Sequence, residues 1–441
     1  MQASPQRALS LFDSTCIIVG IIIGAGVYQM APDIAKGAGS AWGVMALWIL
    51  GGLLSFCGAL SYAELASAYP EHTGGDYVYL TKAYGRPAGF LFGWAQLVIV
   101  RPGDIAVMAF AFATYGRRMV DPLADFPQIS QRLFAAIAVI ALTAINMLGI
   151  RQGKGTQNLL TTVKALGLLA IVAVAVTAPA NTAPAKPVEP LPASLALIFV
   201  LFAYGGWNEM AYVAAEVKNP RKNIVRALVA GTAAVMLLYL LVNGAFLVTL
   251  GYSGLAASEA PASDTLAAVF PEAGSRLISA LVCISALGAL NGLIFTGARI
   301  SYALGSEYRM FRLLGSWNPQ RGTPAPALAV QGLIALILIL VFGGYIDAIL
   351  YTAAAVYAFY LATSISVIVL RFKDPHLDRP YKVTAYPLTP LIFSAVCAFL
   401  IYSSMTYALA IKPVSLIVLL TSLLAGLLIY GFAEKHPRPD R

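Results

Sequence analysis

The chain contains about twelve stretches of roughly 20 mostly apolar residues, and this repetition limits its fold more than any other feature. A helix needs about 20 such residues to cross a bilayer, where lipid offers unpaired backbone groups no hydrogen-bond partners. The sequence therefore predicts an all-α polytopic membrane protein with twelve transmembrane helices and no long soluble domain. The predicted spans begin near Leu11, Trp42, Pro87, Leu133, Gln157, Leu191, Ile224, Ser275, Ala327, Tyr345, Tyr386 and Val414.

Composition and charge agree with this class. Hydrophobic residues make up 59% of the chain, charged residues 11%, and the mean hydropathy is +0.78, which is far more apolar than a soluble domain. If both termini are cytoplasmic, most of the 29 Lys and Arg residues fall in inner loops and tails, and only Arg101 and Lys164 fall in spans. The net charge of +9 then indicates orientation in an inner (plasma) membrane and contact with anionic lipid. The dispersed basic residues form no patch for nucleic acid.

The cysteines and histidines argue against an enzyme, a metal site or a cofactor. All four cysteines fall in predicted spans, where they behave as small buried hydrophobes rather than as a disulfide framework. The three histidines fall outside the spans, so none joins an intramembrane Cys, Ser or Asp in a catalytic centre. These residues are Cys16, Cys57, Cys283, Cys397, His72, His376 and His436.

Glycine-rich sequences interrupt two of the predicted spans. The first span carries Gly-Ala-Gly at 24–26, and the sixth carries a two-glycine sequence with polar neighbours at 203–208. Non-helical backbone at membrane depth survives only where it lines a protein-enclosed cavity. Interrupted spans at corresponding positions of two halves mark the midplane site of a transporter. We therefore expect a ligand site where the two breaks meet.

Such a site suits a zwitterion, because broken helices expose free N–H groups at one end and free C=O groups at the other. We expect the first break to hold a carboxylate and the second break to accept from an ammonium. The predicted donors are the amides around Gly24, Ala25 and Gly26, and the predicted acceptors are the carbonyls of Ala203, Tyr204 and Gly205.

The alternative is that these glycines only allow close helix packing. Packing is the favoured interpretation for Gly20 and Gly24, whereas the Gly205 and Gly206 pair favours the site. A nucleotide-binding loop is excluded, since no G-x-G-x-x-G follows a strand.

The same residues resemble a known family. Residues 23–27 are similar to the G-S/A-G-I/V-F motif of permeases in the amino acid–polyamine–organocation superfamily, and 61–65 with 74–77 resemble its second-span region. Residues 202–208, followed by Glu216, Asn219 and Pro220, closely resemble the F-A-Y-G-G-W-N…E-x-x-N-P run of L-type amino acid transporters. Arg101 and Pro102, 291–299 and 378–381 extend the likeness over nearly the whole chain, as expected for a prokaryotic member.

The resemblance implies a leucine-transporter-type fold with a 5+5 inverted repeat and broken helices 1 and 6. The implied organisation is an N-terminal cytoplasmic tail at 1–10, a first repeat at 11–179 and a second repeat at 191–371. Helices 11 and 12 follow at 386–433, and a cytoplasmic tail ends the chain at 434–441. The implied function is an amino acid exchanger or facilitator that works by alternating access, and we expect a sodium-independent exchanger.

The resemblance also assigns roles to residues. It places the substrate carboxylate on the first-span run, from Ile23 onward, and the amino group on the sixth-span break. In the family, an aromatic residue of the sixth-span motif acts as a lid over the substrate. The matching residue here is Phe202 or Tyr204, and the position of Phe202 in the motif corresponds better. Asn208 is the expected polar contact.

Lys164 lies in the predicted fifth span with no acidic residue within one helical turn, so its ammonium needs carbonyl partners. The resemblance implies that this ammonium occupies the cation site of sodium-coupled relatives and touches the first-span break, which couples it to gating. The alternative is a lysine that reaches the interface, since the inner loop is only about 16 Å of helix away.

Arg101 and Asp104 are three residues apart in the third span, so they can share a helix face and neutralise each other. Pro102 and Gly103 between them predict a kink. Related third spans carry small hydroxylated residues where Gly103 and Asp104 stand, facing the outer part of the substrate pocket. An acidic Asp104, with Glu209 nearby, favours polar or cationic substrates; pairing with Arg101 favours neutral ones, and we expect neutral amino acids.

Animal L-type members are linked to a glycoprotein through a cysteine between spans 3 and 4, and the corresponding loop here, 115–132, has none. A disulfide-linked heavy chain is therefore not expected. Two alternatives to the exchanger stay open: a proton-coupled symporter in which Lys164 titrates, and a membrane amino acid sensor that does not transport.

Overall fold

The computed structural model describes residues 5–178, 187–267, 269–270, 274–341, 345–411 and 413–434, and this part is helical without a β-strand. Residues 1–4 of the predicted N-terminal tail and 435–441 of the predicted C-terminal tail lie outside it. The first half contains α1 (Leu11–Ile22), α2 (Gly26–Gln29), α3 (Ala31–Ala38), α4 (Ala41–Ala68), α5 (Asp76–Tyr84), α6 (Arg86–Ala95), η1 (Gln96–Val100), α7 (Arg101–Met119), α8 (Pro127–Leu148) and α9 (Ile150–Thr177). The second half contains α10 (Ala193–Ala203), α11 (Glu209–Tyr212), η2 (Ala214–Glu216), α12 (Pro220–Ala257), α13 (Pro261–Ala267), α14 (Gly274–Glu307), η3 (Arg309–Phe311), α15 (Ala325–Val341), α16 (Tyr345–Lys373), α17 (Leu388–Ile411) and α18 (Pro413–Ala433).

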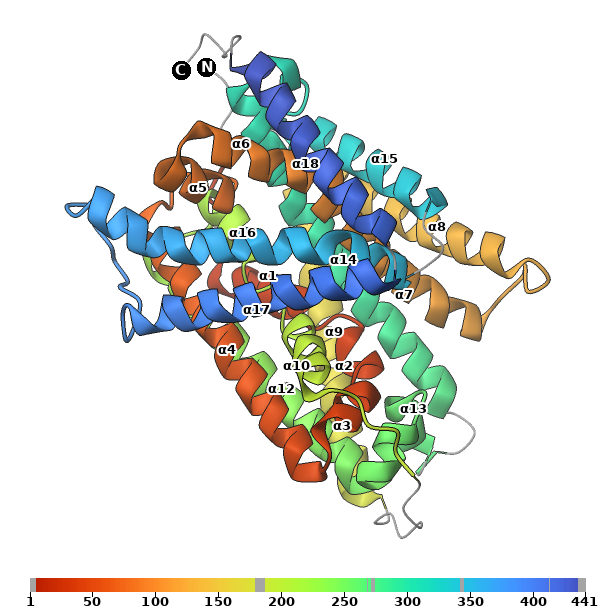
Figure 1. Ribbon diagram of the computed structural model, residues 1–441. Coiled ribbons are helices and arrows are strands. Elements are labelled where there is room, and N and C mark those ends of the chain that lie inside the picture. Colours follow the sequence, from red (N-terminus) through yellow and green to blue (C-terminus); the bar gives the residue numbers. More distant parts are fainter. Residues whose placement is uncertain are drawn as a thin grey trace.

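Each predicted span overlaps a described helix, but not all of these helices are long enough to cross a membrane. Among the described residues, 10 helical stretches are long and apolar enough to cross a membrane, and α10 and α15 are shorter apolar helices. The chain is thus an all-helical polytopic membrane protein. In the bundle, α12 packs on α1 and α4, α14 packs on α7 and α9, and α16 lies beside α17 (Figure 1).

The bundle has an apolar core like that of a soluble protein, but it also exposes many large hydrophobic side chains and buries several charged ones. Leu237, Leu428 and Val176 are at least 60% exposed, which suits contact with lipid chains. Lys164, Arg299, Glu216 and other charged residues are instead buried among the helices. Intramembrane charges in this position mark functional or gating networks.

Two local features position the first break. Ser10 and Asp13 form a capping box that starts α1, and Asp13 also accepts hydrogen bonds from Lys154 and Asn158 of α9. Leu9 pairs through its backbone with the segment that follows the second break, at Glu216 and Lys218. The start of α1 is therefore held against both α9 and the segment that follows the second break.

Candidate substrate-binding site

The predicted break in the first span is present. Helix α1 ends at Ile22, residues 23–25 are not helical, and α2 begins at Gly26. The Gly24 amide donates to the Ile22 carbonyl at 2.8 Å instead of to Gly20 four residues earlier. The carbonyls of Gly20 and Ile23 are thus released from the helical pattern and accept other donors.

The second predicted break is present as well. Helix α10 ends at Ala203, residues 204–208 form turns, and α11 begins at Glu209. Gly206 has φ 114°, a conformation that glycine adopts readily and that other residues adopt only with strain. A Cβ at this position would lie 2.8 Å from Ile21 Cγ2 and 3.2 Å from the Ile22 amide nitrogen. The glycine is therefore required both for the turn and for close approach to α1.

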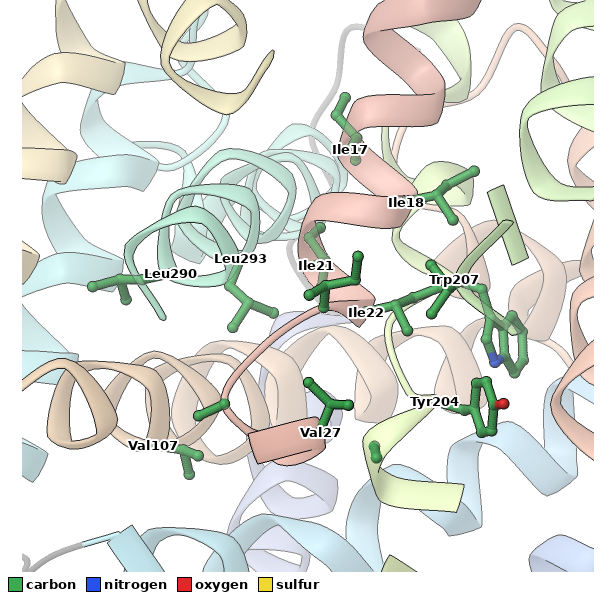
Figure 2. Close-up of a cluster of buried hydrophobic side chains, with 14 of the residues drawn as sticks. Ile17, Ile18, Ile21, Ile22, Val27, Val107, Tyr204, Trp207, Leu290 and Leu293 are labelled. Atoms are coloured by element: carbon green, nitrogen blue, oxygen red, sulfur yellow. The ribbon is translucent and has the colours of Figure 1, made fainter. Parts of the chain in front are cut away.

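The two breaks meet in space. In Figure 2 the ribbon of α1 narrows to a thin trace between Ile22 and Val27, with Trp207 of the second break nearby. The Tyr239 hydroxyl of α12 lies 2.9 Å from the Ile22 carbonyl oxygen and 3.2 Å from that of Ala203. This hydroxyl connects the last turns of α1 and α10. Sequence reasoning missed it, because one tyrosine in an apolar span carries no local signal.

A cavity of about 140 Å³ lies where the breaks meet. For comparison, an engineered cavity of about 150 Å³ binds benzene, so the space suits a small solute. Six of the ten residues predicted to bind substrate line it: Gly24, Gly26, Phe202, Ala203, Gly205 and Asp104. Ser55, Glu209, Thr352 and Tyr360 add polar groups to the wall.

The other four predicted binding residues do not line the cavity. Ile23 and Ala25 are buried, and Tyr204 is buried with its hydroxyl donating to the Trp48 carbonyl at 3.2 Å. Asn208 donates to the Tyr212 hydroxyl at 2.9 Å and accepts from the Tyr360 hydroxyl at 2.7 Å, and it is not part of the cavity wall. Of the two candidate lid residues, Phe202 therefore faces the cavity and Tyr204 does not.

The packing interpretation holds for Gly20, whereas Gly24 serves the cavity. A Cβ on Gly20 would lie about 2.1 Å from Gln157 Nε2 and 2.2 Å from Thr161 Oγ1, both on α9. A Cβ on Gly24 would meet nothing closer than 3.4 Å. Close helix packing thus explains the first glycine, and the second belongs to the cavity wall.

Lys164 is completely buried and reaches the first break. Its Nζ donates to the carbonyl oxygens of Gly20, of Ile23 at 2.7 Å and of Ser285 at 3.3 Å. The Ser285 hydroxyl, from α14, lies 3.0 Å from both the Ile23 and Gly24 carbonyls. This geometry excludes the alternative in which Lys164 extends to the interface, and it supplies the carbonyl partners that a buried ammonium needs.

The expected pairing of Arg101 with Asp104 is wrong. Arg101 Nη1 lies 3.0 Å from Glu209 Oε1 at the start of α11, and its guanidinium carbon lies 5.5 Å from the centre of the Tyr212 ring. Glu209 also accepts from the Thr296 hydroxyl of α14. Sequence spacing suggested a partner on the same helix, but the fold offers Arg101 a carboxylate from the broken sixth span. A π-helical turn, η1, ends immediately before Arg101, and α7 continues through Pro102 and Gly103, so the kink between Arg101 and Asp104 stays a prediction.

Two further ion pairs connect elements of the bundle outside the cavity wall. Arg299 of α14 binds Glu216 through Nε at 2.8 Å and Nη2 at 3.0 Å, and both side chains are fully buried. Glu64 of α4 binds Arg371 of α16 at 2.6 Å and accepts from the Val383 amide at 2.7 Å. The first pair links α14 to η2, which follows the second break, and the second pair links α4 to α16.

Asp76 at the start of α5 adds a buried carboxyl outside the candidate spans. It accepts hydrogen bonds from the hydroxyls of Tyr62 and Thr363. Burial raises the pKa of Asp76 from 3.8 to about 6, although these hydrogen bonds lower it.

Comparisons with known proteins agree with the architecture. The family model described as "Amino acid permease" matches residues 9–433. The mouse (Mus musculus) b(0,+)-type amino acid transporter 1 is 31% identical over 454 residues, covering 99% of this chain and 91% of the relative. The rabbit (Oryctolagus cuniculus) large neutral amino acids transporter small subunit 2 is 32% identical over 434 residues, covering 94% of this chain and 79% of the relative. The chain therefore belongs to the amino acid permease family of membrane transporters, which are not enzymes.

Proposed function

We propose that the protein is a sodium-independent amino acid exchanger that works by alternating access. The observation that carries the proposal is the cavity bounded by two interrupted helices, α1–α2 and α10–α11. Such a pair of breaks offers free amides and free carbonyls a few ångströms apart at the depth of the membrane. The wall of this cavity therefore suits the two ends of an amino acid.

The proposed substrate carboxylate binds at Gly24 and Gly26, where the missing side chains allow close backbone approach. The proposed acceptors for the amino group are the carbonyls of Ala203 and Gly205, which also line the cavity. Phe202, half-buried in the wall, is the proposed lid.

The place of Lys164 supports the proposed sodium independence. Its ammonium is held by the Gly20 and Ile23 carbonyls at the first break and by the Ser285 carbonyl of α14, so it supplies a fixed positive charge where a coupling cation would otherwise need oxygen ligands. A second cation there would meet repulsion and find the carbonyls occupied. We propose that Lys164 and Arg101, each bound to a different break, couple the positions of the breaks during the transport cycle.

The proposed scaffold is a pair of inverted repeats, 11–179 and 191–371, followed by helices 11 and 12 in 386–433. We place both termini in the cytoplasm, on the charge distribution of the loops. The protein is proposed to act in the plasma (inner) membrane without a disulfide-linked heavy subunit, since loop 115–132 has no cysteine and the four cysteines are free and at least half-buried.

Two substrate classes fit this function. The sequence favoured neutral amino acids on the premise that Arg101 cancels Asp104, and cationic amino acids are the alternative. The names of the relatives include both a b(0,+)-type and a large neutral amino acid transporter.

Exchange in sealed proteoliposomes tests the proposal. Labelled amino acid should enter only when unlabelled amino acid is present inside, and equally well in sodium and in choline buffer. Uptake driven by an inward proton gradient into empty vesicles would instead support symport, and binding without flux would support a sensor. Either of these results would refute the proposal that the protein is an exchanger.

A further inference from the structure

Asp104 is a carboxylate in the cavity wall, and among the described residues its neighbour Arg101 forms its ion pair with Glu209 rather than with Asp104. It lies on α7, three residues after Arg101, and it is half-buried and faces the same cavity as Gly24 and Phe202. Among the described residues, the only ion pair of Arg101 is the one to Glu209. The Thr352 side chain of α16 hydrogen bonds to Asp104, which satisfies one acceptor but supplies no charge.

The other charges around the cavity have partners of their own. Glu209, also in the wall, is bound by Arg101 and by the Thr296 hydroxyl. Lys164 is directed to the carbonyls of the first break and does not line the cavity. Arg101, Glu209 and Asp104 together therefore carry one net negative charge, and in the described part of the chain that charge faces the cavity from Asp104.

A carboxylate enclosed with a substrate needs a compensating charge. A substrate side chain that covers Asp104 excludes water from its carboxylate. A neutral side chain leaves the carboxylate desolvated and unpaired, whereas a side-chain cation forms a charge-assisted hydrogen bond with it. The unpaired charge thus discriminates against neutral substrates.

We infer that Asp104 forms a subsite for a positively charged side-chain group, so that the transporter prefers amino acids with a terminal ammonium or guanidinium. This inference rests on the proposed function and names its substrate class. The stem of such a side chain is aliphatic, and the neighbouring wall residues Val107, Leu293 and Val356 are apolar, which suits it.

The test compares lysine with norleucine, which lacks only the terminal ammonium. Exchange of each labelled amino acid is measured in proteoliposomes for the wild type, Asp104→Asn, and the exposed-loop control Asp125→Asn. The wild type and the control should show kcat/KM at least 10-fold higher for lysine. Asp104→Asn should lower the lysine-to-norleucine ratio at least 10-fold. Because each ratio is taken within one preparation, partial misfolding of a variant does not change it.

Two results would overturn the inference alone: a wild type that exchanges norleucine as well as lysine, or an Asp104→Asn variant that keeps the wild-type ratio. A wild type that exchanges neither lysine, norleucine nor any other amino acid would instead refute the proposed function, and the inference with it. A lower ratio in Asp125→Asn would show that the effect is not specific to the cavity, and would also overturn the inference.

Discussion

The buried ammonium of Lys164 offers the sharpest test of how the first break is held. Replacing Lys164 with Ala removes the donor to the Gly20 and Ile23 carbonyls. After this change the Ile23 carbonyl still accepts from the Ser285 hydroxyl at 3.0 Å. The Gly20 carbonyl does not accept from the Gly24 amide four residues later, because that amide donates to the Ile22 carbonyl. A hydrogen bond from a charged donor contributes about 1.5–3 kcal/mol, so losing two of them costs about 3 kcal/mol or more. If the break must be ordered for exchange, about 3 kcal/mol corresponds to a rate roughly 100-fold lower.

The assay is the initial rate of amino acid exchange in proteoliposomes with equal amounts of reconstituted protein. Lys222→Ala, an exposed lysine of α12, is the control and should exchange at the wild-type rate. Lys164→Gln keeps a neutral donor and should fall between Lys164→Ala and the wild type. An Lys164→Ala variant that exchanges within about threefold of the wild type would refute the role assigned to this ammonium, since about 0.7 kcal/mol is less than one charged hydrogen bond.

Three further predictions concern other parts of the fold. Tyr239→Phe removes the hydroxyl that connects the two breaks, so it should lower the free energy of unfolding by about 1 kcal/mol and slow exchange. The control Tyr252→Phe, in the same helix, should change neither quantity. Gly206→Ala should lower the melting temperature, because its Cβ would meet Ile21 at 2.8 Å; Gly244→Ala, with nothing within 4 Å, should not lower it. The pKa of Asp76 is raised, so the folded state binds the proton of this carboxyl more tightly than the unfolded state does. The stability that this proton binding contributes is fully present below about pH 4 and is lost as the pH rises through about 6. Asp76→Asn should therefore gain stability relative to the wild type between pH 4.5 and 7.5, by up to about 3 kcal/mol, and a melting-temperature difference that is flat with pH would contradict this.

The sequence by itself determined the class of fold and the places where it is interrupted. Apolar stretches predict membrane helices because lipid forces each one to satisfy its own backbone, and that requirement is local. The breaks at 23–25 and 204–208 were visible for the same reason, since glycines beside polar residues in a span are a local departure from helix. Lys164 was recognisable from the sequence because it is a charged residue in an apolar span with no acidic residue within one helical turn.

Only the tertiary structure decided how these local features combine. Arg101 pairs with Glu209, 108 residues away, rather than with Asp104, because a guanidinium binds whichever carboxylate the packed helices bring within reach. Tyr239 and Ser285 contact the breaks from two other helices, and their own segments give no sign of it. The partners of buried polar groups depend on which helices are adjacent and how they are rotated, which periodicity along the chain does not specify. The charge of the cavity wall, and with it the substrate class that we infer, is therefore a property of the folded bundle.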